Sequence, residues 1–185
     1  EEPRKFTLRS VIKSIASGSS IALVPILVPT GATDILYSMR VATSEQDCSS
    51  DGNFHRNMSV KYNQIKFLGL PLYERNKGAG LLKTLLDDNR PLREEDAYCD
   101  MYVFRSQSEA KKFQDGTAGT SALKYDVDCS TVGTQSCNGR IPTNGSTKLY
   151  LGFENVRMRY TNYLWVEAVA VVPTTEYYRT KYTID

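Results

Sequence analysis

Alternation of apolar and polar residues dominates this sequence and predicts a mainly β protein. Ile35, Tyr37, Met39 and Val41 alternate with more polar positions, which is the pattern of a strand with one buried face. The strongest strand pattern lies at 163–172, where apolar side chains occupy both phases. We therefore expect a central strand there, covered on both sides.

Weaker patterns extend the β prediction along the chain. An early pair of strands is expected near 6–12 and 21–28, joined by the turn-prone residues 17–20. Pro25 and Pro29 predict that the second of them is an edge strand or an irregular crossing. Further strands are expected at 60–67, 99–104, 122–127 and 147–153.

Two short helices interrupt the strands. Four leucines between positions 81 and 86 form an apolar stripe, and Ser106 followed by Glu109 predicts a capping box that opens a helix ending near Asp115. Residues 128–144 are rich in Ser, Thr, Gly and Asn and predict a long loop.

These elements predict one domain over residues 1–185, an antiparallel β-sandwich or jelly-roll-like fold with two short helices in its connections. Residues 174–185 are expected to form either a further edge strand or a stalk, and the sequence does not choose between them.

Charge and hydropathy exclude some classes of partner. The chain has 23 Lys and Arg residues against 21 Asp and Glu residues, a formal net charge of +2, and its basic residues are scattered. We therefore expect no nucleic-acid partner. No apolar run approaches the roughly 18 residues of a membrane span, so membrane contact is expected only through an anchor outside this chain.

The cysteines and two sequons predict an oxidising compartment. None of the four cysteines belongs to a closely spaced pair, which disfavours structural zinc. We expect two disulfides, and of the three possible pairings we favour Cys48–Cys99 with Cys129–Cys137. The alternative is four free, buried thiols. Asn57 and Asn144 each begin an N-x-S triplet, so both are candidate glycosylation sites. The predicted location is extracellular, at the cell surface or in a secretory lumen.

Motifs for catalysis and cofactors are weak. The single histidine, His55, lies in a turn-like stretch without a serine-hydrolase elbow anywhere in the chain. No cofactor is predicted; Asp47, Asp51 and Asn53 cluster like calcium ligands but lack EF-hand spacing. Carboxylates remain candidates for a hydrolase, in particular Asp100, Glu154 and Glu167.

Tyrosine and arginine, which anchor many interfaces, cluster near the C-terminus. The candidate binding residues are Arg157, Arg159, Tyr160, Tyr163, Tyr177 and Tyr178. We expect a non-enzymatic recognition domain that binds a protein or glycan partner and possesses the capacity to form oligomers. The alternatives are a viral capsid or spike jelly roll for assembly or attachment, and a secreted hydrolase that uses carboxylates.

Overall fold

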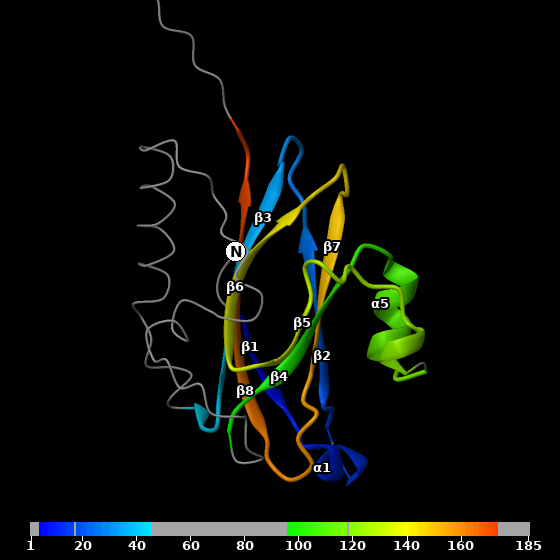
Figure 1. Cartoon of the computed structure of the whole chain (residues 1–185), viewed down its shortest axis with the longest axis vertical. Helices are drawn as coiled ribbons and strands as arrows, with labels where there is room; N and C mark the ends of the chain where they lie inside the picture. Colours follow the sequence, from blue (N-terminus) through cyan, green and yellow to red (C-terminus); the bar gives the residue numbers. More distant parts are fainter. Residues whose placement is uncertain (1–3, 17, 46–95, 118, 174–185) are drawn as a thin grey trace, which may run out of the picture.

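Two four-stranded antiparallel sheets face each other in the computed structural model, which describes residues 4–16, 18–45, 96–117 and 119–173 (Figure 1). Within these residues the only α-helices are two short ones. The mainly β, sandwich-like architecture predicted from the alternation is therefore confirmed.

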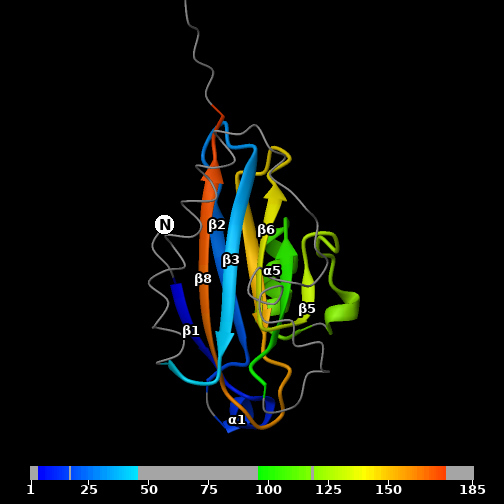
Figure 2. The same cartoon turned by 60° about the vertical axis from the view of Figure 1, so that its left-hand side comes forward.

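The first sheet, sheet A, has the strand order β1-β8-β3-β6. Its strands are β1 (Arg4–Leu8), β8 (Asn162–Val171), β3 (Asp34–Ala42) and β6 (Ser136–Pro142). The predicted strand at 163–172 is confirmed as β8, and it is central because it pairs with β1 on one side and β3 on the other (Figure 2).

The second sheet, sheet B, has the strand order β2-β7-β4-β5. Its strands are β2 (Ile21–Leu27), β7 (Lys148–Glu154), β4 (Cys99–Phe104) and β5 (Thr131–Thr134). Strand β2 is at an edge, as Pro25 predicts, because a proline cannot donate to a second neighbouring strand.

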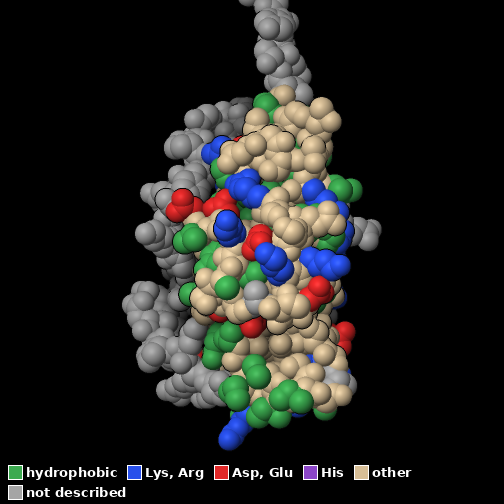
Figure 3. Space-filling model, turned by 90° about the vertical axis from the view of Figure 1, so that its right-hand side faces the viewer, with side chains coloured by type: hydrophobic (Ala, Val, Ile, Leu, Met, Phe, Trp, Pro, Cys, Tyr) green, Lys and Arg blue, Asp and Glu red, His purple; other side chains and the backbone are tan. Residues whose placement is uncertain are grey.

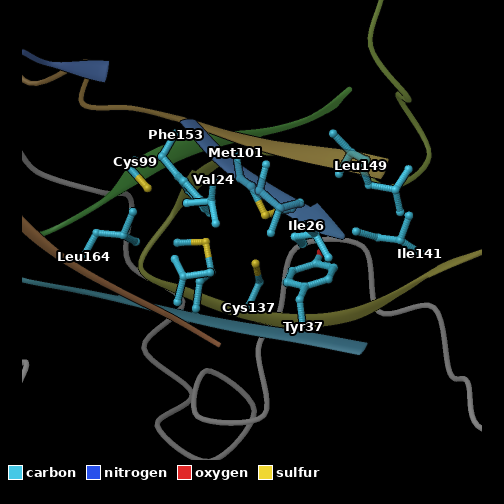
Figure 4. Close-up of a cluster of buried hydrophobic side chains, with 14 of the residues drawn as sticks. Val24, Ile26, Tyr37, Cys99, Met101, Cys137, Ile141, Leu149, Phe153 and Leu164 are labelled. Carbon is cyan, nitrogen blue, oxygen red and sulfur yellow. The ribbon is translucent and has the colours of Figure 1, made fainter. Parts of the chain in front are cut away.

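The side chains between the sheets form the main core (Figure 4). Alternate positions point inward on every strand that contributes, and each fully buried aliphatic or aromatic side chain stabilises the fold by about 1.5–3 kcal/mol. Ten of these side chains are labelled in the figure: Val24, Ile26, Tyr37, Cys99, Met101, Cys137, Ile141, Leu149, Phe153 and Leu164.

A second cluster covers the outer face of sheet B, where helix α5 (Gln107–Gln114) packs. Phe113 of α5 lies over Gly152 of β7, and a Cβ atom at Gly152 would come within 2.5 Å of the Phe113 ring and 2.8 Å of the Phe104 ring. The absence of a side chain at position 152 therefore sets how closely α5 approaches the sheet.

The predicted early strand pair is wrong. Strands β1 and β2 lie in different sheets, and the chain between them forms helix α1 (Val11–Ala16). Ser10 is the N-cap of α1. Its hydroxyl accepts a hydrogen bond from Lys13 N at 3.3 Å, and its carbonyl accepts one from Ser14 N at 2.9 Å. The chain therefore turns into a helix after β1.

Three further local predictions fail. Instead of a strand at 122–127 there is a 3-10 turn (Thr120–Ala122), after which Leu123 packs into the cluster under α5. The predicted loop at 128–144 contains β5 and β6, whose alternation is weak because they are polar edge strands. Ser106 precedes α5 but makes no capping hydrogen bond, so the capping box is not formed.

No disulfide is formed among the cysteines that the structure describes. Cys99, Cys129 and Cys137 are free thiols, and Cys48 lies outside the described residues. The predicted Cys129–Cys137 bridge is wrong, since both residues are free thiols although Cys129 packs against the core that contains Cys137. Burial raises the pKa of Cys137 to about 12 and that of Cys129 to about 11. The oxidising compartment therefore loses the support of the cysteines.

The close approach at Gly152 generates a test. Gly152→Ala is expected to lower the free energy of unfolding by about 1–3 kcal/mol, because the new methyl group overpacks a rigid aromatic contact. Gly119→Ala is the matched control, since a Cβ atom there meets only the Ser121 hydroxyl at 4.0 Å, and its cost should stay within about 0.5 kcal/mol. Urea unfolding measures both, and equal effects would contradict the packing assigned to α5.

Candidate functional site

A hollow of about 460 Å³ lies at the end of the sandwich where β1 and β3 end and β8 begins. The antiparallel register brings these ends together, because Tyr163 of β8 pairs with Thr7 of β1 on one side and with Ala42 of β3 on the other. The lining consists of Thr7, Arg9, Lys13, Thr43, Glu45, Arg157, Arg159, Tyr160, Thr161 and Tyr163.

The lining is cationic. Arg9, Lys13 and Arg159 are exposed around the hollow, Arg157 lies beneath them, and Glu45 is the one acidic residue of the lining. Hydroxyl groups of threonine and tyrosine occupy the remaining polar positions. A site of this composition favours an anionic, hydroxyl-bearing ligand.

The side-chain amide of Asn155 holds the hollow together. It is fully buried, and its Nδ2 donates to the carbonyls of Leu8 at 3.0 Å, Arg9 at 3.1 Å and Tyr160 at 3.0 Å. Its Oδ1 accepts from the backbone N–H of Arg157 at 3.1 Å. Residues almost 150 positions apart in the sequence are thereby fixed beside one another.

Arg157 forms the floor of the hollow rather than its rim, since it is 0% exposed. Its Nη1 donates to Asn162 Oδ1 at 2.6 Å, and Asn162 Nδ2 donates to the Tyr98 carbonyl at 2.6 Å. The guanidinium group also lies 4.8 Å from the centre of the Tyr160 ring. We infer that Arg157 positions Tyr160, which is 46% exposed and faces the ligand side.

Helix α1 is attached to the loop that begins at Asn155. The N–H groups of Val11 and Ile12, which lack partners within a helix, donate to the carbonyls of Arg157 at 3.0 Å and Met158 at 3.2 Å. This attachment sets the position of Lys13 at the hollow.

Gly18 allows Arg9 to lie against the turn after α1. It has φ +81°, and a Cβ atom there would come within 2.9 Å of Arg9 Cγ. Only glycine combines this backbone conformation with room for the arginine stem. Arg9 is thereby accommodated beside Gly18 while it lines the hollow.

The structure brings four of the predicted binding residues together and adds others that sequence reasoning missed. Arg157, Arg159, Tyr160 and Tyr163 all line the hollow. Arg9 and Lys13 were missed because nothing in the sequence relates the N-terminal strand to residues 155–163. Predicted residues that lie outside the described part of the chain are Asp47, Asp51, Asn53, His55, Asn57, Tyr177 and Tyr178.

The second sequon lies in a tight turn between β6 and β7. Asn144 has φ 48°, Gly145 has φ 76°, and Ser146 N donates to the Thr143 carbonyl at 2.9 Å, which describes a type I′ turn. Asn144 is exposed, so its glycosylation stays a prediction that the local geometry accommodates.

The candidate catalytic acids lie away from the hollow. Asp100 and Glu154 are directly opposite each other on β4 and β7, on the outer face of sheet B. Asp100 accepts from Gly133 N at 2.7 Å and from the Tyr102 hydroxyl at 3.1 Å. Burial, and then the nearby charge of Asp100, raise the pKa of Glu154. Glu167 is buried opposite Ser38 in sheet A, so these three acids do not share a site.

Within the described residues, no three cysteine, aspartate or glutamate side chains are grouped as metal ligands would be. No helix in the same part of the chain is long and apolar enough to cross a membrane.

The acidic pair on sheet B predicts a pH-dependent stability. A carboxyl group with a raised pKa in the folded state destabilises that state at neutral pH, and the cost disappears as the pH falls and the group binds its proton. Glu154→Gln should therefore stabilise the protein at pH 7.5, by roughly 0.2–1 kcal/mol for a cross-strand charge pair, and have no effect below about pH 4.

Thermal unfolding across this pH range measures the effect. Glu109→Gln is a control of opposite sign, because hydrogen bonds from Lys112 and from the Lys124 backbone lower the pKa of Glu109. That variant should be less stable than the wild type at pH 7.5. The difference should disappear in acid, because the wild type loses the stabilisation by the charged form of Glu109 as this group binds its proton. A Glu154→Gln gain that persists at low pH would contradict the charge argument.

Comparison with known proteins identifies no relative of this chain. No family model, no curated protein and no solved structure matches it. Its function has to be argued from the hollow and the surfaces beside it.

Proposed function

We propose that this chain is a non-enzymatic recognition domain that binds an acidic saccharide in the cationic hollow. One observation carries the proposal: three exposed cations, two tyrosines and three threonine hydroxyls line a single concave site with one acid among them. Arginine binds carboxylate and sulfate groups with paired hydrogen bonds, and the hydroxyls match those of a sugar ring.

Tyr160 supplies an apolar surface for the ligand. A tyrosine ring combines a flat apolar body with a polar tip, and this ring is held in place by the arginine beneath it. A sugar lying over Tyr160 would have its acidic group within the field of Arg9 and Arg159. Because the acids of sheet B lie outside this site, the proposal includes no hydrolytic step.

The strand order supports a jelly roll as the finer description of the fold. Neighbouring strands pair as β1 with β8, β2 with β7, β3 with β6 and β4 with β5, which is a long hairpin rolled into two sheets. Jelly rolls serve both as lectins and as capsid subunits. This favours assembly or attachment as the second candidate function, although a fold alone does not define an activity.

The extracellular location remains a prediction that now depends on the sequons. Asn144 is the sequon for which the structure provides a surface position. Recognition of an acidic saccharide is compatible with that location and does not require it.

Titration calorimetry tests the proposal with a sulfated hexasaccharide and its desulfated counterpart. We expect the sulfated ligand alone to bind, more weakly as salt is raised because exposed charges are screened. Arg9→Ala and Arg159→Ala should each weaken binding about tenfold, the effect of removing one charged hydrogen bond. Lys111→Ala is the matched control, since it removes an exposed cation from α5.

Three results would overturn the assignment. Equal binding of both hexasaccharides would remove the role of the acidic group. Equal losses of affinity for the sulfated hexasaccharide in Lys111→Ala and Arg9→Ala would place binding outside the hollow. An oligonucleotide that binds as tightly as the sulfated sugar would mean that charge alone is recognised.

A further inference from the structure

Four exposed apolar side chains form a second surface at the same end of the molecule, here called the apolar tip. Ile15 is 85% exposed, Ile12 and Met158 are each 52% exposed, and Val156 is 38% exposed. Figure 3 shows hydrophobic side chains gathered at the lower end, where α1 lies in Figures 1 and 2. Contiguous apolar surface of this kind marks an interaction site.

The apolar tip is built rigidly. The two hydrogen bonds from Val11 and Ile12 to the carbonyls of Arg157 and Met158 join α1 to the loop, so both contribute side chains to one surface. None of the residues of α1 is buried. Val11 and Ser14 are half-buried, whereas Ile12 and Ile15 are exposed. The packing of this molecule does not explain these two exposed isoleucines, because helices are stabilised mainly by burying their apolar side chains.

Cations lie beside the apolar tip. Lys13 lies on α1 between Ile12 and Ile15, Arg159 follows Met158 directly, and Arg9 lies in the adjoining hollow. An anionic surface complements this arrangement. A second copy of the chain does not, because a two-fold interface would bring the same cations together.

The position and size of the apolar tip also indicate which kind of partner it binds. The tip projects at the extreme end of an elongated sandwich (Figure 2), and four side chains are few beside the roughly 20–30 residues that each partner contributes to a stable protein interface. Small projecting apolar groups flanked by cations suit the headgroup and acyl boundary of a bilayer, where amphipathic elements insert.

We propose that the apolar tip docks this domain on an anionic membrane surface. Ile12, Ile15 and Met158 enter the boundary between headgroups and acyl chains, while Lys13 and Arg159 contact anionic headgroups. The contact is peripheral and uses this chain's own residues, in contrast to the expectation from sequence that membrane contact requires an anchor outside the chain.

Vesicle sedimentation tests the docking. Binding is expected to phosphatidylcholine vesicles that contain about 30% phosphatidylserine, and much less to phosphatidylcholine alone. Ile12→Asp with Ile15→Asp should reduce partitioning at least tenfold, because two apolar anchors are lost and two repelling charges are gained. Leu27→Asp is the matched control: Leu27 is 68% exposed but lies at the other end of β2, away from α1.

Tryptophan fluorescence measures insertion of the apolar tip into the bilayer separately from binding. Ile15→Trp should give a blue-shifted tryptophan emission on anionic vesicles and quenching by brominated lipids. Leu27→Trp should give neither, and it corrects for the native Trp165. Circular dichroism of each variant establishes that it is folded before binding is compared.

The outcomes separate this inference from saccharide recognition. A wild-type protein that binds anionic vesicles but no sulfated sugar would overturn only the proposed function. A wild-type protein that binds the sugar but no vesicles would overturn only membrane docking. Equal losses of vesicle binding in Leu27→Asp and in the double variant of Ile12 and Ile15 would overturn the assignment of the apolar tip as the docking surface. Concentration-dependent self-association that Ile15→Asp abolishes, without vesicle binding by the wild type, would assign the tip to a second copy instead.

Discussion

One buried side-chain amide joins the parts of the chain that make both the hollow and the apolar tip. Asn155 donates to the end of β1 and to the loop at Tyr160, and it accepts from the backbone of Arg157. A buried amide without partners costs about 1–3 kcal/mol, so these segments are held together more firmly than surface contacts would hold them. The hydrogen bonds of Asn155 set the distance between Arg9 and Tyr160. They also fix the loop to which α1 is hydrogen-bonded.

The two functional surfaces have complementary chemistry. The hollow collects cations and hydroxyl groups, whereas the neighbouring tip exposes apolar side chains that the molecule does not bury. Electrostatic attraction extends over about 8–10 Å at physiological salt and brings an anionic partner near. Apolar side chains stabilise the complex only once they are in direct contact with the partner. An acidic saccharide at a membrane surface would engage both, and the strand order concentrates both at one end of the sandwich.

The sequence predicts the strongly alternating part of the fold and little of the remainder. Strands β3 and β8 were predictable because inward residues such as Tyr37 and Leu164 recur at every second position, and β2 was predictable as an edge strand from Pro25. Strands β5 and β6 were missed because residues typical of loops, namely Ser, Thr, Asn and Gly, occupy many of their positions. The cysteines were misleading because their even number and spacing carry no information about which sheet each faces.

The candidate site was predictable only in its C-terminal half. Arg157, Arg159, Tyr160 and Tyr163 form a local cluster in the sequence, but the sequence does not reveal that Arg157 is buried or that Arg9 and Lys13 complete the hollow. Both facts depend on the long-range pairing of β1 with β8.

The most direct test of the account is a map of amide chemical-shift changes in the isotopically labelled protein as a sulfated hexasaccharide is added. We expect the changes to concentrate at Thr7, Arg9, Lys13 and residues 159–163, on both sides of the contact that Asn155 makes. Changes centred on α5 and the outer face of sheet B, or none at saturating ligand, would contradict it.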